Sequence, residues 1–460
     1  MNGAGFRLGR HLAAGLLGLA LLLDLWATAS LAAAMGTAND LFPRWYGTRA
    51  WLLSGADPYG AAVTEGIRQA MGGAPGESLG AFVFGFVYPA YVALLLAPLA
   101  VLPFPVAATL WLLLAQLAMG AGAWLCWRAS EREAGCPRAG TIPALLVTLF
   151  LPASLFNLIF GQFAALVFAC LAGSWYLLLQ RRPGWAGVLL SLAMVKPSVA
   201  LLPVAALLFW CTRHRQWRTV ATWLAGSSAL VLASLAVFPG WPVAFWHSTA
   251  EYARVASATS AAGLVAGVLS RPTGSSAGTG LAPQALLTGI TAALAAAAVG
   301  AGWWRSGRRA GDALAAGTLL GAWLVPPLYE WNSVLLLVPL LSWLRRRGQG
   351  GSRPPWPAAA ALVAGALLSI PLIARWPSES RALWPALALV LWSWPGRPRP
   401  APVDPAPAPA EGRAWLRGRH EEGHASRRDV AVVAGHHVAL HQHPLHRGQV
   451  ADAEVDRYQR

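Results

Sequence analysis

Long apolar runs constrain this chain more than any other feature of its sequence. They follow one another almost without interruption from residue 11 to residue 396, and only 12% of all residues are charged, against about 25% in average soluble proteins. Because a helix of about 20 apolar residues spans the hydrocarbon core of a bilayer, the runs predict an all-α polytopic membrane protein. They override the several soluble domains that a length of 460 residues would otherwise suggest.

Twelve of these runs are candidate membrane crossings. They cover residues 11–34, 105–127, 141–156, 163–180, 184–195, 198–212, 219–238, 284–304, 312–326, 328–344, 357–374 and 381–396. A further apolar stretch at 87–103 would reverse the side of every later loop if it crossed, so we expect it to lie in the outer interface. The sequence thus predicts a bundle of about 12 transmembrane helices with short extracytoplasmic juxtamembrane helices.

Two stretches depart from this regular pattern. Residues 184–211 are too few for two full crossings of about 20 residues each, so they form either two short spans or a re-entrant hairpin with Lys196 and Pro197 at its apex. After the last run the composition becomes rich in Pro, Arg and His. We therefore divide the chain into a membrane domain, 1–396, and a cytoplasmic tail, 397–460, that is expected to be disordered.

Basic residues are distributed unevenly between alternate loops. With a cytoplasmic N-terminus, 17 of the 35 Lys and Arg residues fall in inner loops and 8 in the longer outer segments. This bias is typical of multi-pass proteins, so the net charge of +16 is explained by topology and no nucleic-acid partner is expected. The distribution predicts a multi-pass protein of the cell (inner) membrane with residues 35–86 and 239–283 in long extracytoplasmic segments.

Lys196 is the only lysine of the chain, and it stands directly before Pro197 at the end of an apolar segment. A charged group at that depth is costly unless it has an anionic partner or a water-filled cavity. It is either a structural or snorkelling cation or a ligand for a phosphate group, for which an ammonium is a good point-charge partner.

Asp40 stands where the first span emerges on the outer side. Asp is a good N-cap for the helix expected after it, and a carboxylate there can also serve as a general base. Arg44 and Arg49 flank an aromatic pair and are either interfacial anchors or contacts for an anionic head group. Asp24, within the first span, is interpreted as a buried polar contact between helices.

Further polar residues collect at the outer ends of other spans. Asn157 and Gln162 end one span, and Tyr329 and Glu330 begin another. Their common side favours one shared outward-facing site. No nucleotide-binding or zinc-type spacing occurs elsewhere, so no cofactor is expected.

The order of these features resembles the GT-C superfamily of membrane glycosyltransferases, most closely glycosyltransferase family 87. The matching stretches are ND and LLSGADPYG within 39–60, FVYPAYVALLLAPLAVLPF at 86–104, NLIFGQFAALVF at 157–168, AGVLLSLAMVKPSVALLPV at 186–204 and PPLYEWNSVLLLVPLL at 326–341. The chain departs from the family pattern at Tyr88-Pro89-Ala90, at Gly161-Gln162-Phe163-Ala164 and at Tyr329-Glu330-Trp331.

The resemblance implies a GT-C-like fold and a transferase that moves a hexose, mannose in the closest examples, from a polyprenyl-phosphate-linked donor to a lipid or glycan acceptor. It implies inversion at the anomeric carbon, with Asp40 as base and Lys196 near the lipid phosphate. Because the leaving group of such a donor carries one phosphate and not a diphosphate, no metal is expected. Membrane lipids are the other expected partners. The substrate-binding residues that we expect are Lys196, Arg44, Arg49, Tyr59, Tyr88, Asn157, Gln162, Tyr329 and Glu330.

Two other functions remain open from the sequence. A lipid or small-molecule transporter or flippase also suits twelve spans, although no internal repeat of the kind common in transporters relates the two halves. An inactive homologue that serves as a binding partner is the third possibility, and the presence of both Asp40 and Lys196 counts against it.

Overall fold

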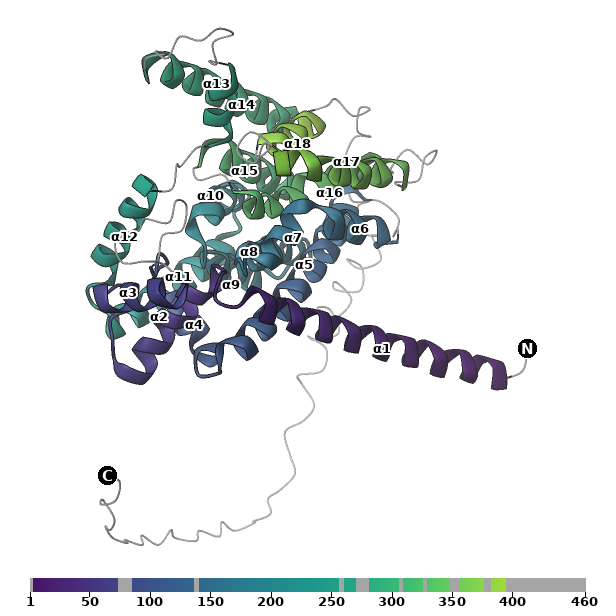
Figure 1. Ribbon diagram of the computed structural model, residues 1–460. Coiled ribbons are helices and arrows are strands. Elements are labelled where there is room, and N and C mark those ends of the chain that lie inside the picture. Colours follow the sequence, from purple (N-terminus) through teal and green to yellow (C-terminus); the bar gives the residue numbers. More distant parts are fainter. Residues whose placement is uncertain are drawn as a thin grey trace, which may run out of the picture. The chain divides into compact units, whose positions relative to one another are not determined.

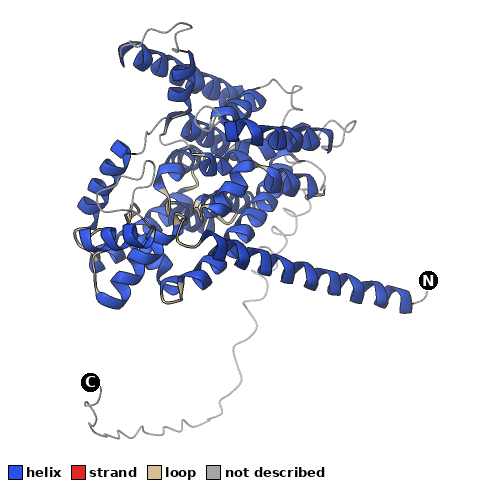
Figure 2. Cartoon of the chain, in the orientation of Figure 1, coloured by secondary structure: helices blue, strands red, loops and turns tan. Residues whose placement is uncertain are grey.

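Helices form the part of the chain that the computed structural model describes. These are residues 3–72, 85–135, 140–255, 260–269, 281–305, 309–325, 329–347, 356–375 and 382–393, and no strand occurs among them (Figures 1 and 2). The all-helical prediction is confirmed for these ranges. The predicted tail, 397–460, lies outside them.

The helices follow the predicted apolar runs closely. In chain order they are α1 (Gly3–Met35), α2 (Leu41–Ser54), α3 (Ala61–Ala70), α4 (Tyr91–Ala100), α5 (Phe104–Ala134), α6 (Ile142–Phe150), α7 (Pro152–Ile159), α8 (Ala164–Leu179), α9 (Pro183–Ala193), α10 (Pro197–Arg213), α11 (Trp217–Val237), α12 (Trp241–Val255), α13 (Ala261–Leu269), α14 (Leu281–Arg305), α15 (Ala310–Leu324), the 3-10 helix η1 (Glu330–Leu336), α16 (Leu337–Arg347), α17 (Trp356–Arg375) and α18 (Leu383–Ser393).

Not every apolar run is long enough to cross a bilayer as one helix. Within the described ranges, four helices are long and apolar enough, namely α1, α5, α11 and α14, and the bent pair α6 and α7 would make a fifth span. The expected count of about 12 is therefore not confirmed. The shorter helices explain the difference, since α9 has 11 residues and a rise of about 1.5 Å per residue leaves it well short of a bilayer of about 30 Å.

Prolines account for several of the helix breaks. Pro152 disfavours a helical conformation at Leu151, which is extended (φ −67°, ψ 122°), and α6 and α7 meet there at 61°. Lys196 precedes Pro197 and is also non-helical (φ −128°, ψ 81°), so α9 ends before it and α10 begins after it. The predicted interfacial stretch 87–103 contains only the ten-residue α4, which is too short to cross.

Helix α5 packs against α8, α16 and α1. Small residues permit the closest approach, as in membrane proteins generally: a Cβ at Gly122 of α5 would lie 2.6 Å from the ring of Phe168 on α8. On α1, by contrast, large apolar side chains such as Leu22 and Trp26 are exposed, as expected for a surface that faces lipid. Asp24 of α1 also lies exposed and accepts a bond of 3.4 Å from Gln116 of α5, so its predicted interhelical contact is confirmed but is not buried.

A network of ion pairs ties together the C-terminal end of α5, the start of α15 and the end of α16. The buried Glu131 carboxylate lies 2.6 Å from Arg128 and 3.4 Å from Arg345, and Arg346 bonds to the buried Asp312 at 2.9 Å. Buried charges persist only when paired. The network thus fixes three helices relative to one another at the end of the bundle that is rich in arginine.

Candidate functional site

Asp40 stands at the N-terminal end of helix α2, but the side chain that caps the helix is that of Asn39. The Oδ1 atom of Asn39 accepts the backbone N–H groups of Leu41 at 2.9 Å and Phe42 at 3.2 Å. The side chain of Asp40 makes no capping bond. The interpretation of Asp40 as the N-cap side chain is therefore wrong, and its carboxylate is available for another role at the start of the helix.

Gln162 connects Asp40 to Lys196. Its Nε2 donates to Oδ2 of Asp40, and its Oε1 accepts a bond of 2.6 Å from Nζ of Lys196. Because an amide has one donating and one accepting end, these two partners fix its orientation. A carboxylate and an ammonium from distant parts of the chain thus lie on opposite ends of one amide group.

Gly161 allows the turn next to Gln162 to approach the start of α2 closely. It has a left-handed backbone (φ 59°), and a Cβ there would lie 3.0 Å from Cβ of Leu41. Its carbonyl accepts the indole N–H of Trp111 at 2.9 Å, and the carbonyl of the preceding Phe160 accepts the N–H of Asp40 at 3.2 Å. The turn between α7 and α8 therefore packs directly on the start of α2.

Lys196 lies in the break between α9 and α10, where its side chain is 7% exposed. Besides Gln162, its Nζ donates to Oδ1 of Asn332 at 2.9 Å. Burial lowers its pKa to about 7, while the nearby Asp40 favours the charged form and Arg44 opposes it. No carboxylate of the described ranges lies within salt-bridge distance of this ammonium, which argues against a structural ion pair.

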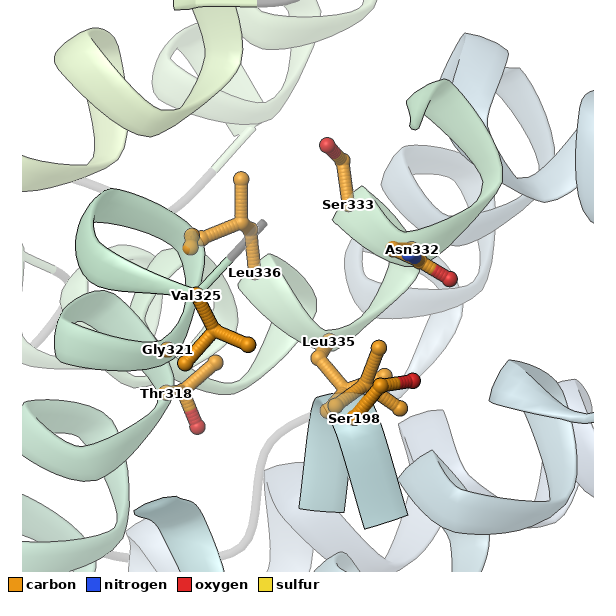
Figure 3. A pocket seen from close by; sticks show the side chains of 10 residues that line it. Ser198, Thr318, Gly321, Val325, Asn332, Ser333, Leu335 and Leu336 are labelled. Atoms are coloured by element: carbon orange, nitrogen blue, oxygen red, sulfur yellow. The ribbon is translucent and has the colours of Figure 1, made fainter. Parts of the chain in front are cut away.

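Asn332 belongs to η1 and also lines a small pocket. The other walls come from the start of α10 and from α15, and the lining includes Ser198, Thr318, Gly321 and Ser333. Figure 3 shows Asn332, Ser333 and Leu335 on η1 and, next to Leu335, Ser198 at the start of α10. The pocket thus lies beside the amide that accepts from Lys196.

Arg44 stands on the same face of the site as Asp40, one turn further along α2. Its Nη1 lies 3.8 Å from Oδ1 of Asp40, and its guanidinium covers the ring of Tyr88 at 4.7 Å. Its Nε is buried and has no hydrogen-bond partner among the described residues. Tyr88 is itself buried, which raises its pKa to about 12, and its backbone carbonyl accepts the hydroxyl of Tyr59 at 2.5 Å.

A group of aromatic side chains lies beside these polar residues. Tyr252, from α12, donates its hydroxyl to Tyr329 at 2.9 Å, and Tyr329 stacks on Trp331 with ring centroids 4.5 Å apart. Trp331 in turn contacts Phe160 at 4.8 Å. Burial raises the pKa of Tyr252, and its bond to Tyr329 joins α12 to the start of η1, the helix that carries Asn332.

Two of the expected site residues bond to backbone carbonyls instead of to the side chains of Asp40, Gln162 or Lys196. Arg49 donates to the carbonyl of Ala100 at the end of α4, at 2.8 Å, and is not brought to Asp40. Asn157 is fully buried and donates to the carbonyl of Trp331 at 3.4 Å, so it supports η1 from beneath. The side chain of Glu330 lies outside the described part of the molecule.

Two residues of the site were missed by the sequence interpretation. Asn332 lies within the stretch at 326–341 but is not among the expected site residues, and Tyr252 lies within the segment 239–283, from which no site residue is expected. A signal existed for Asn332, which follows Tyr329-Glu330-Trp331 at the outer end of an apolar run. Tyr252 carried none, because its place depends on how the segment after α11 folds back.

Among the described residues, no three His, Cys, Asp or Glu side chains lie together where they could hold a metal ion. The site instead combines one carboxylate, two cations and two amides. The expectation that no metal and no cofactor are needed stays a prediction.

Comparison with known proteins identifies the family. The model of glycosyltransferase family 87 matches residues 86–327, which is more than half of the chain. The match includes Tyr88, Gln162, Lys196 and Tyr252, and Asp40 precedes it. No curated protein and no solved structure matches the chain. The chain belongs to glycosyltransferase family 87.

Proposed function

We propose that this membrane glycosyltransferase moves a hexose, in the first place mannose, from a polyprenyl-phosphate-linked donor to a lipid or glycan acceptor on the extracytoplasmic side. One observation carries the proposal. Gln162 holds the Asp40 carboxylate at one end of its amide and the Lys196 ammonium at the other. The base and the phosphate-binding cation are therefore near each other, with the amide group of Gln162 between them.

The charge of the site suits a donor with a single phosphate. Lys196 in its protonated form, Arg44 and Asp40 sum to one positive charge, and a polyprenyl-phosphate sugar is a phosphodiester with one negative charge. The buried Nε of Arg44 has no partner among the described residues. A phosphate oxygen would satisfy it, and charge-assisted bonds of this kind are among the stronger ones in proteins.

The reaction follows from these positions. An acceptor hydroxyl attacks the anomeric carbon, and its proton passes to Asp40 as the new glycosidic bond forms. The bond between the anomeric carbon and the phosphate oxygen breaks on the opposite face, and the polyprenyl phosphate departs with its charge neutralised by Lys196 and Arg44. Attack and departure on opposite faces invert the configuration.

The Asp40 carboxylate is partly exposed, and one of its oxygen atoms can still accept a hydrogen bond, as a base requires. Gln162 occupies Oδ2, whereas Oδ1 faces Arg44 at 3.8 Å, which is longer than a hydrogen bond. The side chain is 24% exposed. An acceptor hydroxyl therefore has room to bond to Oδ1.

The proposal is tested with wild-type protein in proteoliposomes. Labelled polyprenyl-phosphate-mannose and polyprenyl-phosphate-glucose are supplied with an acceptor extract, with and without EDTA. We expect one hexose to be transferred, with the anomeric configuration of the product opposite to that of the donor by NMR, and with the same rate in EDTA. If no sugar moves from either donor while labelled lipid crosses the bilayer, a transporter replaces this proposal.

A further inference from the structure

Helices α8 and α10 end in the same backbone motif. The N–H groups of Arg181 and Arg182 bond back to carbonyls in the last turn of α8, at 3.0 and 2.9 Å. Those of Arg215 and Gln216 do the same at the end of α10, at 3.2 and 2.8 Å. Each pair of bonds forms a Schellman motif, in which the residue after the C-cap is left-handed and is usually glycine. In this chain an arginine occupies that position in both turns.

The left-handed backbone at these two positions is unfavourable for arginine. φ is 58° at Arg181 and 55° at Arg215, and no other residue of the described ranges except glycine has a positive φ. A side chain with a Cβ is strained there, whereas glycine is not. At the ends of α2 and α5 the chain has Gly55 (φ 64°) and Gly135 (φ 67°) in the left-handed position. Because glycine would relieve the strain in both turns, we expect the two arginine side chains to have a role that offsets it.

The two turns lie beside each other. Thr219 of α11 is buried and donates its hydroxyl to the carbonyl of Pro183, the first residue of α9, at 3.1 Å. A Cβ at Gly187 of α9 would lie 2.8 Å from the backbone nitrogen of Trp223, so α9 and α11 are in close contact. The two turns thus form one surface, which we call the arginine patch. Its members are Arg181, Arg182, Arg213, Arg215 and Arg218.

The positive charge of the arginine patch is not balanced. All five side chains are exposed, and their guanidinium groups make no hydrogen bond or ion pair within the described part of the chain. Two helix N-termini add positive potential, because Arg182 directly precedes α9 and Arg218 lies in the first turn of α11. Neither first turn contains an acidic residue or a side-chain cap. The patch therefore attracts an anion.

Two exposed tryptophans indicate the kind of anion. Trp185 in the first turn of α9 is 66% exposed, and Trp217 at the start of α11 is 59% exposed. Helix α11 is one of the helices long and apolar enough to cross a bilayer, so Trp217 and the arginine patch lie where a candidate span ends. Tryptophan is enriched at the level of the lipid head groups. The anions of that layer are the phosphates of phospholipids.

Membrane topology is the simplest other explanation, since arginine is common in inner loops. That role requires positive charge in the loop but not at a particular residue. Arg182, Arg213 and Arg218 already supply the charge without a left-handed backbone. Topology therefore leaves the positions of Arg181 and Arg215 unexplained.

We propose that the arginine patch binds the head group of an anionic phospholipid, with Arg181 and Arg215 contacting its phosphate. Guanidinium groups form charge-assisted bonds to phosphate oxygens, often two at once, and basic pockets between membrane helices bind anionic head groups. Lys196 lies at the opposite ends of α9 and α10. The lipid site is thus separate from Asp40 and Lys196 and does not depend on the glycosyl transfer proposed above.

The test compares the full-length wild type with Arg181→Gly/Arg215→Gly and Arg181→Lys/Arg215→Lys, all purified in detergent. Thermal unfolding is recorded without lipid, with dioleoyl-phosphatidylglycerol and with dioleoyl-phosphatidylcholine. Without lipid, the glycine variant should unfold at a higher temperature than the wild type, because the strain is removed. Phosphatidylglycerol should stabilise the wild type and the lysine variant more than phosphatidylcholine does. The glycine variant should gain equally little from both lipids.

Native mass spectrometry measures the bound lipid directly. We expect the glycine variant to bind phosphatidylglycerol at least about tenfold more weakly than the wild type, since each arginine near the membrane surface raises the affinity severalfold. Arg347→Ala removes an exposed arginine of α16 and should bind phosphatidylglycerol as the wild type does. sn-Glycerol 3-phosphate, which has no acyl chains, should stabilise none of the proteins.

Three results would overturn the proposal. The first is equal binding of phosphatidylglycerol by the wild type and the glycine variant, and the second is a wild type that does not prefer phosphatidylglycerol to phosphatidylcholine. Either result would leave the arginines with a topological role alone. The third is stabilisation by sn-glycerol 3-phosphate as strong as that by phosphatidylglycerol, which would identify the ligand as a soluble anion. A glycine variant that unfolds at a lower temperature than the wild type without lipid would contradict the strain argument on which the proposal rests.

Discussion

Two adjacent residues have different roles at the start of α2. Asn39 satisfies the first free N–H groups of the helix, so that the Asp40 carboxylate can turn to Gln162 and Arg44. The sequence Asn39-Asp40 permitted either residue to cap. The choice depends on Gly161, which lies against Asn39 and Leu41 in the folded protein, and that contact cannot be deduced from local sequence.

Lys196 should make donor use sensitive to pH. Because burial lowers its pKa to about 7, the ammonium of the free enzyme loses its proton as pH rises through that value. We expect kcat/KM for the polyprenyl-phosphate donor to fall above about pH 7, and kcat to fall only at higher pH, because bound phosphate stabilises the ammonium.

Lys196→Arg is the control for that profile, since a guanidinium stays charged throughout the range. Its kcat/KM, whatever its absolute value, should show no fall between pH 7 and pH 9. A wild-type kcat/KM that stays flat or rises over the same interval would contradict a role for the Lys196 ammonium in donor binding.

At the scale of elements, the site is built on breaks between helices. The breaks at Pro152 and Pro197 were foreseeable from the prolines themselves, and the structure has helices ending before both. Which breaks meet was not foreseeable. The turn between α7 and α8, the break between α9 and α10, and η1 are joined only by long-range packing, and hydropathy carries no information about it.

Among the contacts between elements, we expect the one at Gly161 to tolerate substitution least. Gly161→Ala places a Cβ 3.0 Å from Leu41 on a left-handed backbone, so it should destabilise the protein by about 1–2 kcal/mol and move Gln162 away from Asp40. Thermal unfolding and transfer rate in detergent measure both effects. Gly120→Ala, a helical position of α5 with open space around it, should be neutral or slightly stabilising. Equal behaviour of the two variants would refute the argument.

The ion-pair network between α5, α15 and α16 should contribute to stability and not to chemistry. Glu131→Gln leaves Arg345 buried beside a neutral group, and loss of one partner of a buried pair costs about 3–5 kcal/mol. Glu65→Gln changes a carboxylate that is 48% exposed in its pair with Arg68, so it should cost less than Glu131→Gln. Denaturant unfolding measures the free energy of unfolding of both variants. Similar losses in the two variants would contradict a larger contribution from the network around Glu131.

At the scale of the whole molecule, the sequence predicted helical class and family but not the number of crossings. Apolar composition determines that a segment enters the membrane environment, whereas the length of each helix depends on where Pro, Gly and packing end it. Six of the runs give single helices of 11 to 17 residues, such as α9, that are too short to span by themselves. The arginine bias still predicts the sides of the loops.

Topology is testable with single cysteines in a chain whose four native cysteines are replaced by alanine. Ser54→Cys, at the exposed end of α2, should react with an impermeant maleimide in intact cells, because the proposed orientation puts the Asp40 side outside the cytoplasm. Arg213→Cys, at the exposed end of α10, should react only after the cells are opened. Labelling of the reverse pattern, or of both positions from outside, would contradict the arginine-based orientation.

The most direct test of the central claim is transfer by Asp40→Asn in proteoliposomes. The substitution keeps the size of the side chain and removes the base, so we expect a loss of at least about a hundredfold with unchanged unfolding temperature. Asp24→Asn changes an exposed carboxylate of α1 and should retain wild-type transfer. An Asp40→Asn protein that transfers sugar at a rate close to that of Asp24→Asn would show that Asp40 is not the base.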